Sequence, residues 1–180
     1  MSLIPDHYGS KLPASVVPPA SYEEACDFFG WSSDYFALGR EQPLPDWEHR
    51  LTIITLPARL VFAGQPVLRV RVHERCAAWA AAALAELHVK GLWDFLNPYG
   101  GSYNFRLMRG GSRLSAHAFG AAFDFDPGGN PLGASMSASR FGSEARGMDA
   151  VRVLEEWGWF WGGRFISRPD PMHFQFGVNW

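Results

Sequence analysis

The chain has 180 residues, with 16 basic and 18 acidic side chains and a net charge of −2. This length suits one domain, with or without a tail, and allows roughly 70% of the unfolded chain's surface to be buried. The near balance of charge gives no argument for a nucleic acid or an anionic membrane as partner. The sequence contains no apolar run of about 18 residues that would span a bilayer.

Residues 1–20 are rich in proline and serine, and we expect them to form an extended arm ahead of a single domain over residues 21–180. Asp6 and three prolines within the first 18 residues do not resemble a secretory signal. We therefore expect synthesis in the cytoplasm. If the substrate lies outside the cytoplasm, another route must deliver the protein there.

Ser21 and Glu24 form a capping box, which predicts a short helix that ends at Gly30. Residues 31–50 are mixed in character and indicate a loop. The alternation within residues 51–72 favours a strand pair, with a turn at residues 64–66.

The clearest predicted helix covers residues 74–90 and ends at Gly91, because its apolar side chains follow helical spacing: Ala77, Ala80, Ala81, Leu84 and Leu87. A second helix is predicted from about residue 143 to 157, with Met148, Val151 and Leu154 on one face. Helices and strands do not alternate regularly, so we expect an α+β fold with a small antiparallel sheet flanked by helices.

Two cysteines, Cys26 and Cys76, are too few for a disulfide framework or a thiolate zinc site. We expect both to be buried free thiols.

The segment of residues 115–124 combines a histidine with an aspartate seven positions later, His117 and Asp124. Strand-like alternation places Phe123 and Phe125 on one face and Asp124 on the other. Residues 120–122 are small and allow a tight turn between the two polar side chains. This arrangement fits a metal site on a sheet.

Alternation in residues 170–176 places His173 and Gln175 on one strand face, with Phe174 and Phe176 on the other. Two histidines and one aspartate leave a fourth position for water, which is the pattern of a catalytic zinc site. Asp170 is the candidate general base. On pattern alone the alternative is open, because such spacings are common by chance and a strand histidine is usually structural.

The residues Ser115, His117, Gly120, Ala122 and Asp124, followed by Asp170 and His173, resemble the signature of the zinc D-alanyl-D-alanine carboxypeptidases. Relatives of that family include the L-alanyl-D-glutamate endopeptidases of phage lysis enzymes. Residues 161–163 and 103–106 also resemble the family. The resemblance extends over residues 20–180 and is sharp from about residue 100 onward.

The resemblance implies a hedgehog and D-Ala-D-Ala-peptidase-like fold, with Zn²⁺ bound by His117, Asp124 and His173 and with Asp170 as the catalytic acid and base. It implies that Arg106 stabilises the oxyanion or anchors the substrate, with Arg109 and Arg113 as rivals for that role. Ser115 is expected near the substrate or in support of the ligand loop. Tyr103 is a candidate to line the cleft, with packing as the alternative.

The implied activity is hydrolysis of peptidoglycan stem peptides, at the L-Ala-D-Glu or the D-Ala-D-Ala bond, by a monomer. Small size and the absence of a signal resemble phage or prophage lysis enzymes, which favours the endopeptidase. Two alternatives remain: a zinc-containing binding module without hydrolysis, since hedgehog domains share a similar zinc fold, and a phage structural or wall-anchoring component attached through the arm.

Several other residues have plainer interpretations. Asp126 begins a turn-like segment, so we expect a turn or a supporting role. The tryptophans at positions 157, 159 and 161 could stack on glycan, but core packing is the preferred interpretation. No serine-hydrolase elbow is present around residues 112–115.

Overall fold

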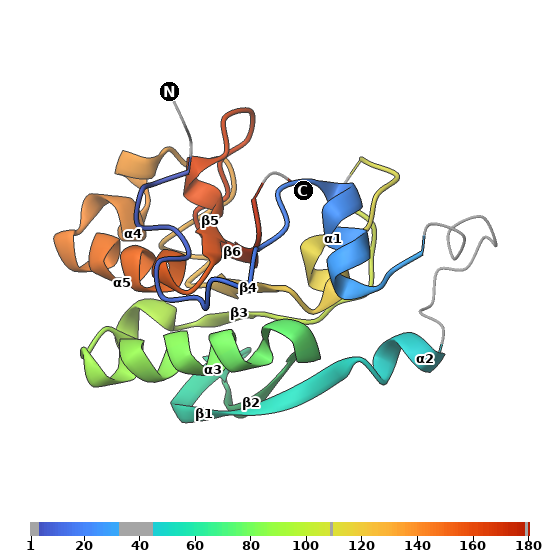
Figure 1. Ribbon diagram of the computed structural model, residues 1–180. Helices are drawn as coiled ribbons and strands as arrows, with labels where there is room; N and C mark the ends of the chain where they lie inside the picture. The colour runs from blue at the N-terminus through green and yellow to red at the C-terminus, as the bar shows by residue number, and fades with distance from the viewer. Residues whose placement is uncertain (1–3, 33–44, 109, 179) are drawn as a thin grey trace.

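A computed structural model describes residues 4–32, 45–108, 110–178 and 180. Two antiparallel sheets and their flanking helices form an α+β fold, as predicted (Figure 1). One sheet is a hairpin of β1 (Leu51–Phe62) and β2 (Gln65–His73). The other has the strand order β3-β4-β6-β5, with β3 at Tyr99–Gly101, β4 at Ala122–Phe125, β5 at Trp159–Trp161 and β6 at His173–Phe176.

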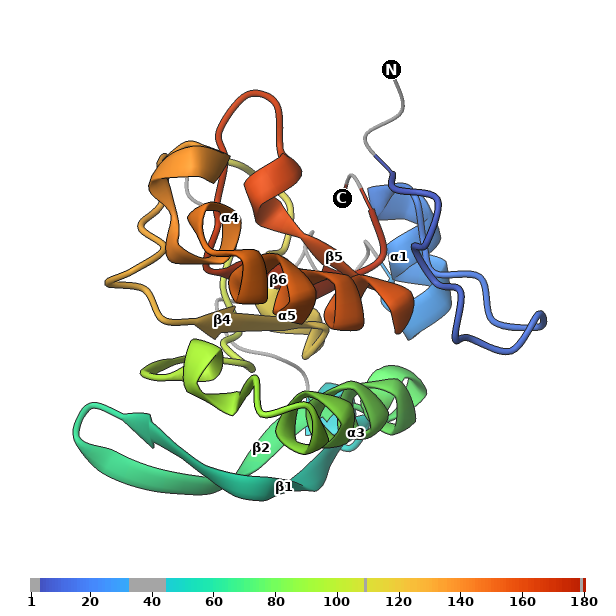
Figure 2. The ribbon, with the colours of Figure 1, turned by 90° about the vertical axis from the view of Figure 1, so that its left-hand side faces the viewer.

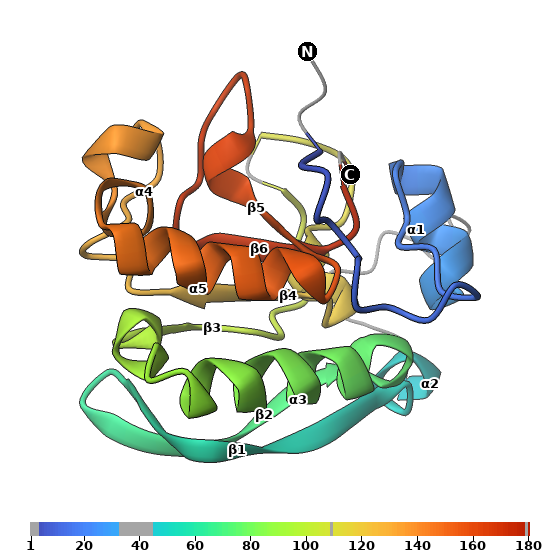
Figure 3. The ribbon, with the colours of Figure 1, turned by 60° about the vertical axis from the view of Figure 1, so that its left-hand side comes forward.

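Helix α3 (Glu74–Val89) packs on the hairpin and also contacts α5 (Ala145–Glu156) (Figure 3). Its buried face carries Ala77, Ala80, Leu84 and Leu87, as predicted, whereas Ala81, which was expected on that face, is exposed. The face of α5 that holds Val151 and Leu154 is buried as well. Both predicted long helices are therefore present, within two residues of their expected bounds.

Shorter elements complete the fold. Helix α1 (Tyr22–Phe29) begins at the predicted cap Ser21 and ends at Gly30, whose φ of 71° suits glycine. The remaining short helices are α2 (Pro45–Glu48), α4 (Arg140–Ser143), η2 (Trp93–Leu96), η3 (Ala116–Phe119), η4 (Met136–Ala138) and η5 (Gly162–Arg164). Helix α2 corrects the expectation of a loop throughout residues 31–50, because Pro45–Glu48 form a turn of helix with a proline at its first position.

The hairpin turn also differs slightly from the prediction. It lies at Ala63 and Gly64, both with positive φ, rather than at residues 64–66. Pro66 instead pairs with Val61 inside the ladder. A two-residue turn of this kind matches the right-handed twist of the two strands, which explains why pairing continues up to Phe62 and Gln65.

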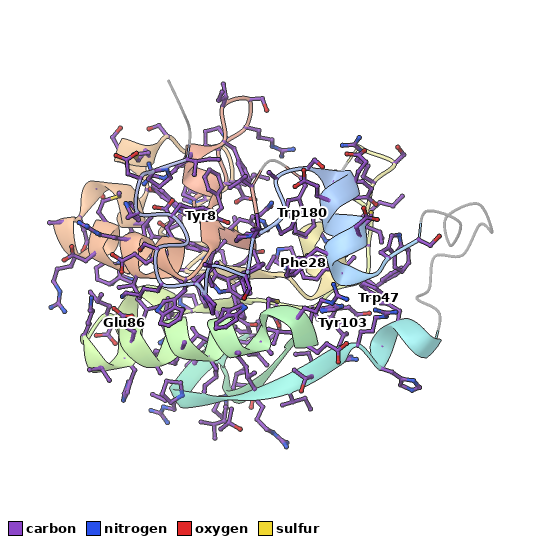
Figure 4. The ribbon with its side chains drawn as sticks, viewed as in Figure 1. Tyr8, Phe28, Trp47, Glu86, Tyr103 and Trp180 are labelled. Carbon is purple, nitrogen blue, oxygen red and sulfur yellow. The ribbon has the colours of Figure 1, made fainter. Side chains whose placement is uncertain are left out.

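The N-terminal segment of residues 4–20 lies against the body of the molecule (Figure 2). The Tyr8 hydroxyl donates to the Gly158 carbonyl at 2.8 Å, and the amide of Gly177 donates to that hydroxyl at 3.2 Å (Figure 4). Leu12 packs against the core. The division between an arm over residues 1–20 and a domain over 21–180 stays a prediction.

Aromatic side chains fill the core between the four-stranded sheet and its helices. Trp159 and Trp161 are fully buried, which confirms packing rather than glycan stacking for these two residues. Trp157 is partly buried and donates from Nε1 to Glu86 at 2.9 Å. Cys76 is buried and Cys26 is half-buried, and both are free thiols. Within the described residues no helix is long and apolar enough to cross a membrane.

Candidate metal centre

Strands β4 and β6 place Asp124 and His173 side by side. They are direct partners in the antiparallel register, so their side chains leave the same face of the sheet. The opposite face carries the phenylalanines of both strands, and the rings of Phe123 and Phe125 stack at 5.5 Å. The alternation read from the sequence is therefore present in both strands, and burial of the aromatic face fixes the polar face toward the site.

His117 reaches the same point from η3, the short helix just before β4. The Ser115 hydroxyl caps this helix by accepting a hydrogen bond from the His117 amide at 3.3 Å. Gly120 ends the helix with a φ of 68°, and a Cβ there would lie 2.9 Å from the His73 amide nitrogen. The Gly120 carbonyl accepts a hydrogen bond from that amide at 2.9 Å, which ties the ligand loop to the end of the hairpin.

A backbone carbonyl sets the tautomer of His117. Nδ1 of the ring lies 2.6 Å from the Ser102 carbonyl oxygen. A carbonyl only accepts, so Nδ1 carries the proton. In the neutral ring Nε2 then presents a lone pair, and it lies 3.2 Å from Oδ1 of Asp124.

Gln175 sets the tautomer of His173 in the same way. The Gln175 amide nitrogen donates to the Trp180 carbonyl at 3.2 Å, which leaves its Oε1 as the acceptor for His173 Nε2 at 3.1 Å. The neutral ring therefore presents a lone pair at Nδ1, which lies 3.1 Å from Oδ1 of Asp124.

Three acceptors thus converge when both imidazoles are neutral, namely Nε2 of His117, Nδ1 of His173 and Oδ1 of Asp124. Such a group repels itself unless a cation lies among its members. One ligand atom from each residue lies within 4.8 Å of the others. Tetrahedral zinc at ordinary bond lengths needs ligand atoms roughly 3.3 Å apart, close to the two distances from Asp124. The residues therefore fit a zinc ion.

Asp124 is held in the charged form that a metal ligand requires. Burial alone would raise the pKa of this carboxyl, but the imidazoles of His117 and His173 donate to it in their protonated forms, and this effect outweighs burial and holds its pKa far below the usual range.

Asp170 lies in the segment just before β6, and two contacts fix that segment. The Asp170 amide donates to the Gly162 carbonyl at 2.9 Å, and Trp161 Nε1 donates to the Pro171 carbonyl at 2.7 Å. A Cβ on Gly162 would lie 2.5 Å from the Asp170 carbonyl oxygen, so a larger residue there would push the segment away. The pair Trp161–Gly162 therefore positions Asp170.

The Asp170 side chain is suited to carry a proton. Burial is the main cause that raises the pKa of this carboxyl, and the charge of Asp124 acts in the same direction against the opposing effect of His173. Its Oδ1 is buried, and no hydrogen-bond donor among the described residues reaches it. A carboxyl of this kind beside a metal cluster is a candidate general acid and base.

Two hollows meet at the cluster. The larger one, about 330 Å³, contains Asp170, Phe165 and Arg168 together with all three candidate ligands. The smaller one, about 200 Å³, contains Tyr103 and shares Arg106, His117 and Asp124 with the first. The candidate metal centre therefore lies in an open groove.

The structure separates two of the three arginine candidates, Arg106 and Arg113. Arg106 lines both hollows, whereas Arg113 pairs with Glu23 at 3.2 Å and stacks on Tyr22 outside them. Arg109 lies outside the described residues. The catalytic role of Arg106 stays a prediction.

Ser115 lines the larger hollow and caps η3. These contacts agree with the expected role of Ser115 in supporting the loop that carries His117. Tyr103 lines the smaller hollow, with the Arg71 guanidinium 4.7 Å from its ring centroid (Figure 4). Asp126 organises a turn, because it accepts from the Gly129 amide at 3.1 Å, in agreement with its predicted role.

Three contributors were not assigned a role from the sequence: the Ser102 carbonyl, the Gln175 side chain and Arg168. Gln175 shares a strand face with His173, and that spacing was the available signal. Arg168 lies two positions before Asp170, and that closeness in sequence was its signal, whereas Ser102 comes close to the site only through the fold.

Residues 109–176 match the D-alanyl-D-alanine carboxypeptidase family. The matched segment is less than half of the chain but holds all three candidate ligands and Asp170. This match confirms the family resemblance and indicates a peptidase. No curated protein and no solved structure matches the chain.

Proposed function

We propose that this protein is a zinc metallopeptidase that hydrolyses peptide bonds in peptidoglycan stem peptides. The observation that carries the proposal is the convergence of three acceptors on one point beside the half-buried Asp170, whose Oδ1 is buried. The family match supports hydrolysis of a peptide as the reaction. Candidate bonds are L-Ala-D-Glu and D-Ala-D-Ala, and we favour the first.

A zinc ion held by His117, Asp124 and His173 would supply Lewis acidity and would make the attacking water more acidic. Asp170 accepts the proton of the attacking water and later passes it to the leaving amine. Its raised pKa makes the protonated form accessible for the second step. Arg106 lines both hollows and supplies positive charge for the developing oxyanion. No covalent enzyme intermediate is required, so Ser115 acts as support.

The same features favour an enzyme over a zinc-containing binding module. A binding module needs the three ligands but has no use for a carboxyl whose Oδ1 is buried without a donor, because such burial costs about 1–3 kcal/mol. We further propose that the protein acts on the cell wall after delivery from the cytoplasm, as phage lysis enzymes do.

The test uses purified wall fragments and mass spectrometry of the products. Native protein is compared with chelator-treated protein, with Asp170→Asn and with Asp149→Asn, a control in α5 that lines neither hollow. Metal content and thermal unfolding are measured for each. We expect Asp170→Asn to keep its metal and fold but to lose about 10²–10⁴-fold in kcat, while Asp149→Asn retains full activity.

The product masses identify the bond that is cut. Folded, metal-loaded native protein that cleaves none of the fragments would overturn the peptidase. Full activity in Asp170→Asn would remove Asp170 from the proposed acid and base role and leave the metal site in place.

A further inference from the structure

The smaller hollow is built mostly from residues outside the segment that matches the carboxypeptidase family. Its walls include Phe62 at the end of β1 and residues 100–104, the first two of which are the last two residues of β3. It shares Arg106, His117 and Asp124 with the larger hollow. Any chain that crosses the metal centre can therefore continue into both hollows.

Two glycines form the floor of the smaller hollow. A Cβ on Gly100 would lie 2.7 Å from Cβ of Asp124, so a side chain there would displace a candidate ligand. Gly101 has a φ of 129°, and a Cβ there would meet nothing within 4 Å. At Gly101 the lining is therefore backbone beside open space, which suits an extended chain with small side chains.

Phe62 is an apolar wall that the fold holds in place. Its exposed fraction is 47%, although its ring meets Tyr99 edge-on with centroids 6.3 Å apart. The neighbouring Val61 amide donates to Asn97 Oδ1 at 2.9 Å, and the Arg59 carbonyl accepts from Trp93 Nε1 at 2.9 Å. These bonds fix the end of the hairpin, so the exposed ring is available to a ligand at little cost in ordering.

The position of Asp170 sets the direction of the substrate. Asp170 lines the larger hollow and is absent from the lining of the smaller one. In the proposed reaction Asp170 gives its proton to the leaving amine, so the amine side of the scissile bond lies in the larger hollow. The acyl side therefore points toward the smaller hollow.

We infer that the smaller hollow binds the acyl-side part of the substrate, with Phe62 packed against the group that extends beyond the acyl-side residue. This inference rests on the proposed function for the direction of the chain. The ligand is the part of the substrate on the amino side of the scissile bond. It is an extended acyl chain, joined by an amide bond to the amino group of the residue that carries the scissile carbonyl. Residues 51–104 thus contribute to substrate length selection.

The test compares two substrates that share one scissile bond, one with a minimal acetyl group on the acyl side and one extended by the natural stem portion. The quantity of interest is the ratio of their kcat/KM values. We expect native protein to prefer the extended substrate and Phe62→Ala to lower that ratio about tenfold, the effect of removing partial burial of an aromatic ring. Phe62→Tyr keeps the ring and retains the preference.

Leu68→Ala is the matched control, because Leu68 is 55% exposed on the same hairpin but does not line the hollow. Its ratio should equal that of native protein. An unchanged ratio in folded Phe62→Ala overturns the inference, as does a native protein without any preference.

Binding provides a second readout that does not depend on cleavage. Calorimetry measures the affinity of the acyl-side fragment alone for chelator-treated native protein, Phe62→Ala and Leu68→Ala. If only Phe62→Ala binds the fragment more weakly, the result supports binding of the acyl-side fragment in the smaller hollow, even if no substrate is cleaved. The absence of cleavage would contradict only the proposed function. Equal binding by all three proteins, or none by native protein, overturns the inference.

Discussion

Nε2 of His173 donates to Oε1 of Gln175 at 3.1 Å, two positions further along the same face of β6. Gln175 in turn donates to the Trp180 carbonyl at 3.2 Å, which fixes the orientation of its amide. The imidazole is therefore oriented, with its Nδ1 toward Asp124, before any cation binds.

Replacing Gln175 by leucine should weaken zinc binding about 10–100-fold, because His173 loses the acceptor that orients its ring. Competition with a chromophoric chelator measures this affinity. Gln65→Leu is the control, since Gln65 is exposed at the start of β2. Equal affinities in native protein and Gln175→Leu would show that the hydrogen bond does not support the metal site.

Zinc should raise the thermal stability of the protein, because a cation removes the repulsion among the three acceptors around Asp124. With free zinc at 1,000 times its Kd, the expected stabilisation is about 4 kcal/mol. Scanning calorimetry with zinc, with magnesium and with chelator measures it. Magnesium should have little effect, since imidazole ligands suit zinc better. Identical unfolding temperatures in all three conditions would contradict the proposed metal site.

His73 should make stability depend on pH. Its ring is fully buried, donates from Nε2 to the Phe29 carbonyl at 3.1 Å, and accepts at Nδ1 from the Arg75 amide at the start of α3. Burial, assisted by the charges of Arg50 and Arg75, lowers the pKa of His73 from 6.5 to about 4.

The unfolded chain therefore takes up a proton near pH 6.5, where the folded protein does not. The free energy of unfolding should fall as the pH drops from 6.5 to about 4, by about 3 kcal/mol in total. Urea unfolding of native protein and His73→Gln at several pH values isolates this contribution. The same pH dependence in both proteins would exclude His73 as its source.

Glu155 holds the N-terminal segment and η5 together. Its carboxylate is fully buried and accepts from Arg164 at 2.6 and 3.0 Å and from His7 at 2.9 Å. Glu155→Gln should cost about 3–5 kcal/mol, since it leaves Arg164 without its charged partner. Glu144→Gln, which removes an exposed pair with Arg140, should cost less than about 1 kcal/mol. Urea unfolding would contradict this prediction if both variants lost the same small amount.

The sequence predicted the parts of the fold that local rules control. Ser21 and Gly30 bound a helix because capping depends on neighbouring residues, and the alternation around Phe123 and Phe174 predicted two strands with one aromatic face. The same alternation assigned His173 and Gln175 to one side of β6. The candidate ligands could therefore be named together before the fold was known.

Other features depend on contacts between distant segments. The Tyr8 hydroxyl bonds to Gly158 and Gly177, and no local pattern in a proline-rich stretch predicts such partners. The Ser102 carbonyl lies beside His117 because of the path of the chain after β3. The wall at Phe62 likewise requires the hairpin and β3 to meet, which periodicity cannot predict.

Two backbone carbonyl groups orient the imidazoles, that of Ser102 directly and that of Trp180 through Gln175. They also determine how long a segment must be to reproduce the site in another protein. Residues 109–176 hold all three candidate ligands, yet the Ser102 carbonyl precedes that segment and the Trp180 carbonyl follows it. A fragment cut at those bounds, or grafted onto another scaffold, would carry the ligands without either outer anchor. The shortest segment that keeps the ligands and both anchoring carbonyl groups is therefore longer than the segment that matches the family.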